Sequence, residues 1–100
     1  MTDANAPLDA VLSHVDANIE ESLERLFTLL RIASISTDPA YAGECLKAAE
    51  WLTDQLNGLD FEATVRPTPG HPMVVAHQRD AAGANVLFYG HYDVQPVDPI

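Results

Sequence analysis

Two residues in the segment 89–96, Tyr-Gly-His-Tyr-Asp-Val-Gln-Pro, are the best candidates for chemistry: His91 and Asp93. Residues two apart in an extended chain project to the same side, so both side chains can approach one site. A neutral imidazole is a good ligand for zinc and similar divalent metals. A metal-bound histidine usually needs an acceptor on its other ring nitrogen, which a carboxylate can supply directly or from nearby. Such a pair can supply a metal-binding histidine, His91, and a carboxylate that orients it, Asp93.

A His-x-Asp pair alone is weak evidence, because it occurs by chance in many chains and a structural histidine is then the better interpretation. The context favours a site. Residues 86–89, Val-Leu-Phe-Tyr, are apolar on both faces and predict a strand buried inside a sheet that helices cover. His91 would follow that strand, at the edge where α/β sheets place their ligands. Gly90 allows a backbone or a substrate to come close.

The N-terminal part of the chain has an apolar stripe at helical period that predicts one long amphipathic helix, with Pro7 in its first turn. The stripe consists of Leu8, Val11, Leu12, Val15, Ile19, Leu23, Leu26, Phe27 and Leu30. We expect this helix to pack on a sheet, since the stripe is short for a coiled coil.

A second helix is predicted over residues 40–57, after a loop at 33–37. Asp38 is a candidate N-cap, Pro39 suits the first helical position, and Gly58 is placed to end the helix. Its predicted buried face consists of Ala42, Leu46, Ala49, Leu52 and Leu56.

Two strands are predicted after this helix. In residues 61–66 the apolar side chains alternate with polar ones, which is typical of a half-exposed strand. Residues 67–70, Pro-Thr-Pro-Gly, predict a turn, and residues 73–76 predict a more buried partner strand in a β-hairpin. The order of elements predicts an α/β layer structure with a mixed sheet.

Composition narrows the class of protein. The chain has 100 residues with 5 basic and 15 acidic side chains, a formal net charge of -10, which argues against nucleic-acid and anionic-membrane partners. No apolar run approaches the ~20 residues of a spanning helix, and residues 1–9 show no secretory signal. The single cysteine, Cys45, fits a reducing compartment. We therefore expect a soluble, cytoplasmic protein.

The segment Gly-His-Tyr-Asp-Val-Gln-Pro at 90–96, followed by Val-Asp-Pro, resembles the first metal-binding motif of the co-catalytic di-zinc metallopeptidases. This family includes aminoacylase, glutamate-type carboxypeptidases, succinyl-diaminopimelate desuccinylase and carnosine-type dipeptidases, and the motif is most similar to the dipeptidase branch. Residues 30–36, 48–61 and 70–75 also resemble family segments, although Ala33 stands where proline is common.

The resemblance implies a three-layer α/β/α zinc-exopeptidase catalytic domain, of which residues 1–100 would be the N-terminal portion, with the lid or dimerisation domain outside this chain. It implies a homodimeric enzyme that hydrolyses amide bonds in dipeptides or small peptides with two divalent metal ions, Zn before Mn or Co. His91 would be a ligand of one zinc and Asp93 its orienting carboxylate. The other ligands and the glutamate general base would follow Ile100, so we expect the chain alone to be inactive.

Two alternatives stay open. The same motif style serves N-acyl amino-acid deacylases and carboxypeptidases, and the apolar stripe would also suit a small, non-catalytic helical interaction module. Seven other side chains are of types that can bind a metal or act as nucleophiles, but their positions indicate structural roles. They are His14, His71, His77, Cys45, Ser34, Ser36 and Thr37.

Overall fold

The computed structural model describes residues 5–98, which belong to two units divided after Arg31. Residues 1–4 and 99–100 lie outside the described residues, and with them the start of the segment examined for a secretory signal and the final proline of the Val-Asp-Pro extension.

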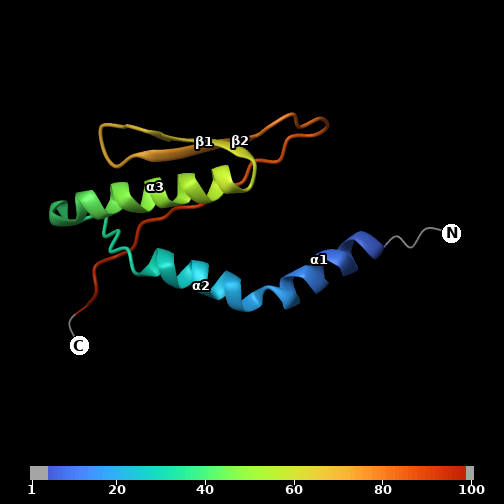
Figure 1. The fold of residues 1–100 in the computed structure, drawn as a ribbon. Helices are drawn as coiled ribbons and strands as arrows, with labels where there is room; N and C mark the ends of the chain where they lie inside the picture. Colours follow the sequence, from blue (N-terminus) through green and yellow to red (C-terminus); the bar gives the residue numbers. More distant parts are fainter. Residues whose placement is uncertain (1–4, 99–100) are drawn as a thin grey trace. The chain divides into compact units, whose positions relative to one another are not determined.

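The first unit contains two helices, α1 (Ala6–Ala17) and α2 (Ile19–Leu30), where the stripe predicts a single long helix (Figure 1). The interruption is Asn18, whose backbone N–H donates to the carbonyls of His14 and Val15, at 3.1 and 3.2 Å. Its side-chain Nδ2 also donates to the His14 carbonyl, at 2.8 Å. Asparagine side chains compete for backbone groups in this way, which disfavours them in helix interiors. Pro7 lies in the first turn, as predicted.

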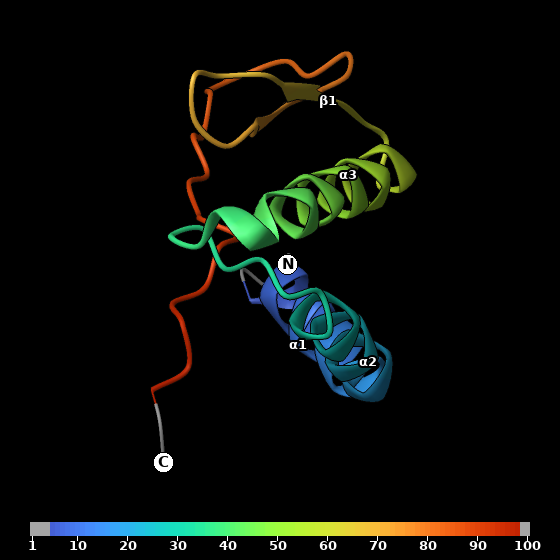
Figure 2. The same cartoon turned by 90° about the vertical axis from the view of Figure 1, so that its left-hand side faces the viewer.

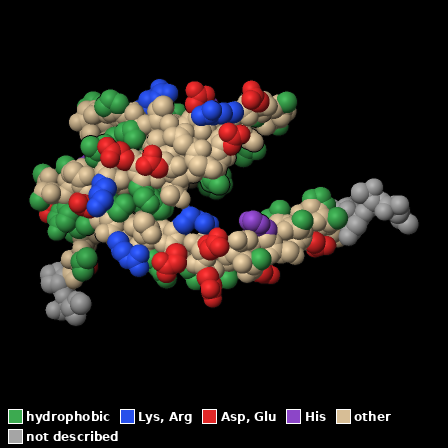
Figure 3. Space-filling model, viewed as in Figure 1, with side chains coloured by type: hydrophobic (Ala, Val, Ile, Leu, Met, Phe, Trp, Pro, Cys, Tyr) green, Lys and Arg blue, Asp and Glu red, His purple; other side chains and the backbone are tan. Residues whose placement is uncertain are grey.

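The apolar stripe lies on the surface of α1 and α2, and neither helix has a buried residue. Its nine side chains are 41–60% exposed. Figure 3 shows hydrophobic and acidic side chains together on the surface of this unit. The packing of the stripe on a sheet stays a prediction. No helix among residues 5–98 has the length and apolarity that crossing a membrane requires.

The second unit begins with a loop and a short 3-10 helix, η1 (Pro39–Tyr41), which leads into α3 (Ala42–Gly58). The predicted cap is confirmed, because Asp38 Oδ1 accepts the backbone N–H of Ala40 at 3.0 Å. The helix also ends at Gly58 as predicted. The left-handed residue that follows is Asp60, with a φ of 67°.

The fully buried face of α3 agrees with the predicted one only at Ala49. Cys45, Ala48 and Ala49 are fully buried, whereas Leu46, predicted to be in the core, is 42% exposed. Ala42 is exposed as well, and Leu52 and Leu56 are half-buried. Small side chains let a sheet approach a helix closely, and α3 packs on both strands of the hairpin (Figure 2).

The hairpin consists of β1 (Phe61–Arg66) and β2 (Met73–Gln78), paired antiparallel from Phe61 with Gln78 to Arg66 with Met73. Asn57 at the end of α3 is bonded to β1: its Oδ1 accepts the Ala63 N–H at 2.9 Å, and its Nδ2 donates to the Ala63 carbonyl at 3.3 Å. The hairpin and the alternation of β1 are confirmed. The second strand is less buried than predicted, with Met73 57% exposed.

The prediction of a third strand at residues 86–89 is wrong. Residues 86–89 form no strand, and their side chains are 84–94% exposed. A strand requires a hydrogen-bonding partner, and within residues 5–98 the sheet contains only β1 and β2, which pair with each other. The structure therefore confirms a small α/β arrangement of helices and a two-stranded antiparallel sheet.

Candidate metal site

The backbone that carries His91 and Asp93 is held by a loop far away in sequence. Ile35 and Val94 form an isolated parallel bridge, and the Val94 N–H donates to the Ser34 carbonyl at 2.9 Å. The Ser34 hydroxyl donates to the Tyr92 carbonyl, also at 2.9 Å. Ser34 is 1% exposed, so its bonds are shielded from water. The residues on both sides of Asp93 are therefore fixed to one buried serine.

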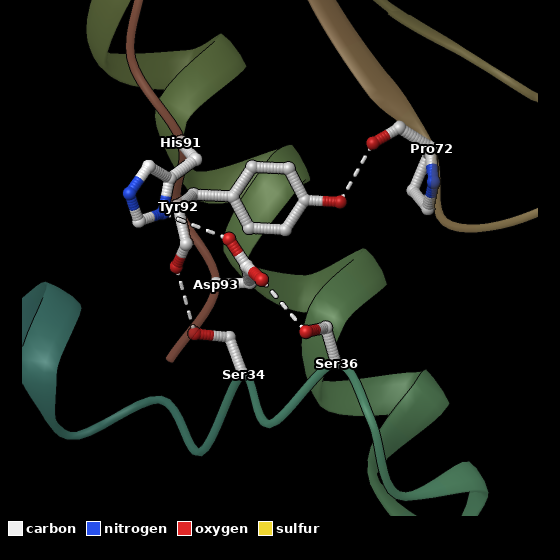
Figure 4. Close-up of polar contacts among 6 residues, drawn as sticks. All are labelled: Ser34, Ser36, Pro72, His91, Tyr92 and Asp93. Carbon is white, nitrogen blue, oxygen red and sulfur yellow. Dashed lines mark hydrogen bonds and ion pairs between the residues drawn. The ribbon is translucent and has the colours of Figure 1, made fainter. Parts of the chain in front are cut away.

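His91 and Asp93 are in direct contact, as their spacing predicts. His91 Nδ1 lies 2.9 Å from Asp93 Oδ1. An ionised carboxylate only accepts hydrogen bonds, so the Nδ1 proton is the donor, and in the neutral ring Nε2 then carries the lone pair. Figure 4 shows the second ring nitrogen pointing away from the other labelled residues. The His91 side chain is 75% exposed, which leaves that nitrogen accessible to an ion.

The second carboxylate oxygen of Asp93 has its own partner. The Ser36 hydroxyl donates to Oδ2 at 2.7 Å. This hydrogen bond is the main cause that lowers the pKa of Asp93 below its ordinary value, and the bond from His91 lowers it further against the opposing effect of desolvation. Asp93 is therefore ionised at neutral pH, which is the state that accepts from both neighbours.

The turn between the two strands also contacts this loop and the motif. His71 Nε2 lies 2.6 Å from the Ser36 carbonyl, and the Tyr92 hydroxyl donates to the Pro72 carbonyl at 2.6 Å (Figure 4). The Thr68 hydroxyl donates to the His71 carbonyl at 2.6 Å. His71 thus has the structural role in the turn that the sequence favours.

Cys45 of α3 lies beside the motif as a buried, neutral thiol. Burial raises the pKa of Cys45, and the charges of Asp93 and Glu44 raise it further. Burial also raises the pKa of Tyr92, with added contributions from Cys45 and Asp93. Both groups stay protonated at neutral pH, so Cys45 is a packing residue, as predicted, rather than a thiolate ligand or nucleophile.

These residues fit one ligand position of a metal site. An exposed imidazole nitrogen, with the other ring nitrogen bonded to a carboxylate, is the usual arrangement of a histidine ligand. Among residues 5–98 no group of three His, Cys, Asp or Glu side chains is close enough to hold a metal ion. A catalytic zinc needs about three protein ligands. The described residues therefore supply one candidate ligand, and the role of His91 stays a prediction.

Sequence reasoning missed the part played by Ser34 and Ser36, which it assigned to loop and capping roles. The signal was their spacing: two residues apart, they alternate as a short strand would, like His91 and Asp93. Their partners lie 57 or 58 positions further along the chain. No local pattern identifies a partner at that distance.

The sequence of this chain is similar to those of two metallodipeptidases. No protein-family model matches the chain, and no solved structure matches it significantly. The Cys-Gly metallodipeptidase DUG1 of Candida albicans is 31% identical over 104 residues, which is 90% of this chain and 21% of that protein. The Saccharomyces cerevisiae protein of the same name is 26% identical over 103 residues, 89% of this chain and 21% of that protein. The chain spans about a fifth of the length of these relatives, and its resemblance to the metallodipeptidases is confirmed.

Proposed function

We propose that this chain is part of the catalytic domain of a metal-dependent dipeptidase, with His91 as a metal ligand and Asp93 as the carboxylate that orients it. The observation that carries the proposal is the 2.9 Å contact between His91 Nδ1 and Asp93 Oδ1. It fixes the ring through Nδ1 and leaves Nε2, the other ring nitrogen, accessible to an ion. The similarity to two metallodipeptidases over about nine-tenths of the chain supports the same conclusion.

The roles of the residues follow from their chemistry. Asp93 accepts a hydrogen bond from the Nδ1 proton of His91, which holds the neutral ring in one tautomer and one orientation. The ionised carboxylate also makes the ring a stronger electron donor at Nε2. A bound divalent ion supplies polarisation of an amide carbonyl and acidification of a water molecule. Zinc is the first candidate, with manganese or cobalt as alternatives, and the remaining ligands would come from residues outside those described.

The proposed substrate class is the dipeptide, since both relatives are named as Cys-Gly metallodipeptidases. A second metal ion and a homodimeric assembly belong to the same proposal. The proposed fold is a three-layer α/β/α domain with a mixed sheet, with the lid or dimerisation domain outside this chain. The described residues contribute to that proposal one antiparallel pair, β1 with β2, and a separate, isolated parallel bridge between Ile35 and Val94.

The test is made on the full-length protein that contains this chain, with His91→Ala, Asp93→Asn and, as a matched control, His77→Ala. His77 is an exposed histidine near the end of β2. Bound zinc is measured by mass spectrometry and hydrolysis of Cys-Gly and other dipeptides by amino-acid release. We expect Asp93→Asn to lose about 10- to 100-fold in metal affinity or activity, His91→Ala to lose more, and His77→Ala to match the parent protein.

Two results would contradict the proposal. One is a metal-loaded parent protein that releases no amino acid from any dipeptide. The other is a His91→Ala protein that binds zinc and hydrolyses dipeptides as the parent does.

A further inference from the structure

We infer that Ser36 is a positioning residue that acts on His91 through Asp93: its hydroxyl holds one carboxylate oxygen, and this reserves the other oxygen for the imidazole. The inference concerns a residue that the sequence assigned only to a loop. It rests on the proposed function for its effect on metal binding. Its effect on the imidazole itself stands on the described contacts alone.

The two oxygens of the Asp93 carboxylate have different partners. Ser36 Oγ donates to Oδ2 at 2.7 Å, and His91 Nδ1 lies 2.9 Å from Oδ1. The terminal torsion of an aspartate is broad and roughly two-fold, so backbone placement alone does not fix the carboxylate plane. Two donors on different oxygens do fix it. Without Ser36 the carboxylate plane is free to rotate away from the ring.

The backbone around Asp93 and Ser36 is already restrained by other hydrogen bonds. Ser34 bonds to the Tyr92 carbonyl and accepts from the Val94 N–H, which holds the backbone on both sides of Asp93. Ser36 is itself held, since His71 Nε2 lies 2.6 Å from its carbonyl oxygen. The remaining freedom is the side-chain torsion of Asp93, which the Ser36 hydroxyl and the His91 ring restrain together (Figure 4).

The consequence is a fixed tautomer. A correctly oriented, ionised Oδ1 keeps the proton of the neutral imidazole on Nδ1, so Nε2 presents its lone pair outwards. A rotated carboxylate loses that bond, and the ring then also populates the Nε2–H tautomer, which cannot bind a metal through Nε2.

The experiment compares Ser36→Ala and Ser36→Thr with Thr37→Ala in the full-length protein. Thr37 is the adjacent hydroxyl residue and is exposed, so it is a matched control. The first measurement is the 15N chemical shifts of the His91 ring in the metal-free protein, recorded at a pH high enough that these shifts no longer change with pH. We expect the parent, Ser36→Thr and Thr37→Ala to show the Nδ1–H tautomer, and Ser36→Ala to show a mixture.

The second measurement is zinc affinity by competition with a chelating dye. We expect Ser36→Ala to bind zinc about 3- to 10-fold more weakly, below the loss typical of residues that touch the ligand directly, and Ser36→Thr to restore the affinity. A purely structural serine would alter the fold, as seen in near-ultraviolet circular dichroism, without changing the tautomer of a folded protein.

The inference is overturned if folded Ser36→Ala shows the same His91 15N chemical shifts as the parent protein. It is also overturned if Thr37→Ala changes these shifts as much as Ser36→Ala does, or if folded Ser36→Thr differs from the parent as Ser36→Ala does. These results do not depend on dipeptide hydrolysis. A tautomer shift in a protein that hydrolyses no dipeptide would support the positioning role and contradict the proposed function.

Discussion

Two neighbouring segments of the second unit differ in a way that their composition does not suggest. Residues 86–89 are entirely apolar or aromatic, yet their side chains are 84–94% exposed. Residues 92–94 include a charged aspartate, yet Tyr92 and Val94 are bonded to the buried Ser34 and Asp93 to Ser36. The apolar segment has no partner strand within residues 5–98, and the polar one is anchored.

The difference shows that apolarity and anchoring are separate properties. The hydrophobic effect is non-directional, so burial of an apolar segment is favourable whichever apolar surface covers it. A hydrogen bond requires a specific donor and acceptor at a defined distance and angle. The Ser34–Ser36 loop supplies such groups to residues 92–94. Residues 86–89 remain an unpaired apolar segment, and we expect them to promote association of the isolated chain.

The largest expected effect comes from weakening the anchored segment by Ser34→Ala. Removal of a hydroxyl that is 1% exposed leaves the Tyr92 carbonyl without its partner. Loss of a buried hydrogen-bond partner costs about 1–3 kcal/mol. We therefore expect the free energy of unfolding, measured by urea denaturation, to fall by about that amount.

Thr37→Ala is the control for Ser34→Ala, because it removes an exposed hydroxyl from the same loop. A surface change of this kind stays within about 0.5 kcal/mol. Equal effects from the two substitutions would mean that Ser34 does not anchor residues 92–94.

The next largest expected effect is a pH dependence of the stability that the Ser36–Asp93 hydrogen bond contributes. The Ser36 hydrogen bond holds the pKa of Asp93 below its ordinary value, so the folded state favours the ionised carboxylate. This stabilisation is present above the ordinary pKa of about 3.9 and is lost as the pH falls through the lower folded value. We expect the difference in stability between the parent and Ser36→Ala to be largest near neutral pH and to shrink below about pH 4.

Urea denaturation at a series of pH values measures this difference. The stability difference between the parent and Thr37→Ala should not vary with pH. A Ser36→Ala difference that stays constant into acid would show that the hydrogen bond does not depend on the Asp93 charge.

The smallest expected effect is in the exposed segment. Leu87 and Phe88 are 93% and 94% exposed, so Leu87→Ser and Phe88→Ser should change the free energy of unfolding by less than about 0.5 kcal/mol. Both substitutions should reduce self-association in sedimentation velocity, because they remove exposed apolar surface. A loss of stability comparable to that of Ser34→Ala would show that residues 86–89 are packed in the folded chain in solution.

Much of the fold was predictable where local chemistry decides it. The alternation at residues 61–66, the Asp38 cap and the end of α3 at Gly58 each depend on a few adjacent residues, and all three are confirmed. The break between α1 and α2 was missed because the apolar stripe continues through it, while the side chain of Asn18 competes for a helix carbonyl. The buried face of α3 was predicted correctly only at Ala49, because small residues, rather than the larger leucines, permit the close approach of the hairpin.

The sequence by itself determined the candidate pair, His91 and Asp93, since a spacing of two in an extended chain places both side chains on one side. It also determined the family resemblance, through a motif of seven adjacent residues and the similarity around it. Only the tertiary structure decided which groups hold that pair: Ser34 on the backbone and Ser36 on the carboxylate. These contacts join segments 57 or 58 residues apart, and the geometry of a hydrogen bond across such a separation exists only once the chain has folded.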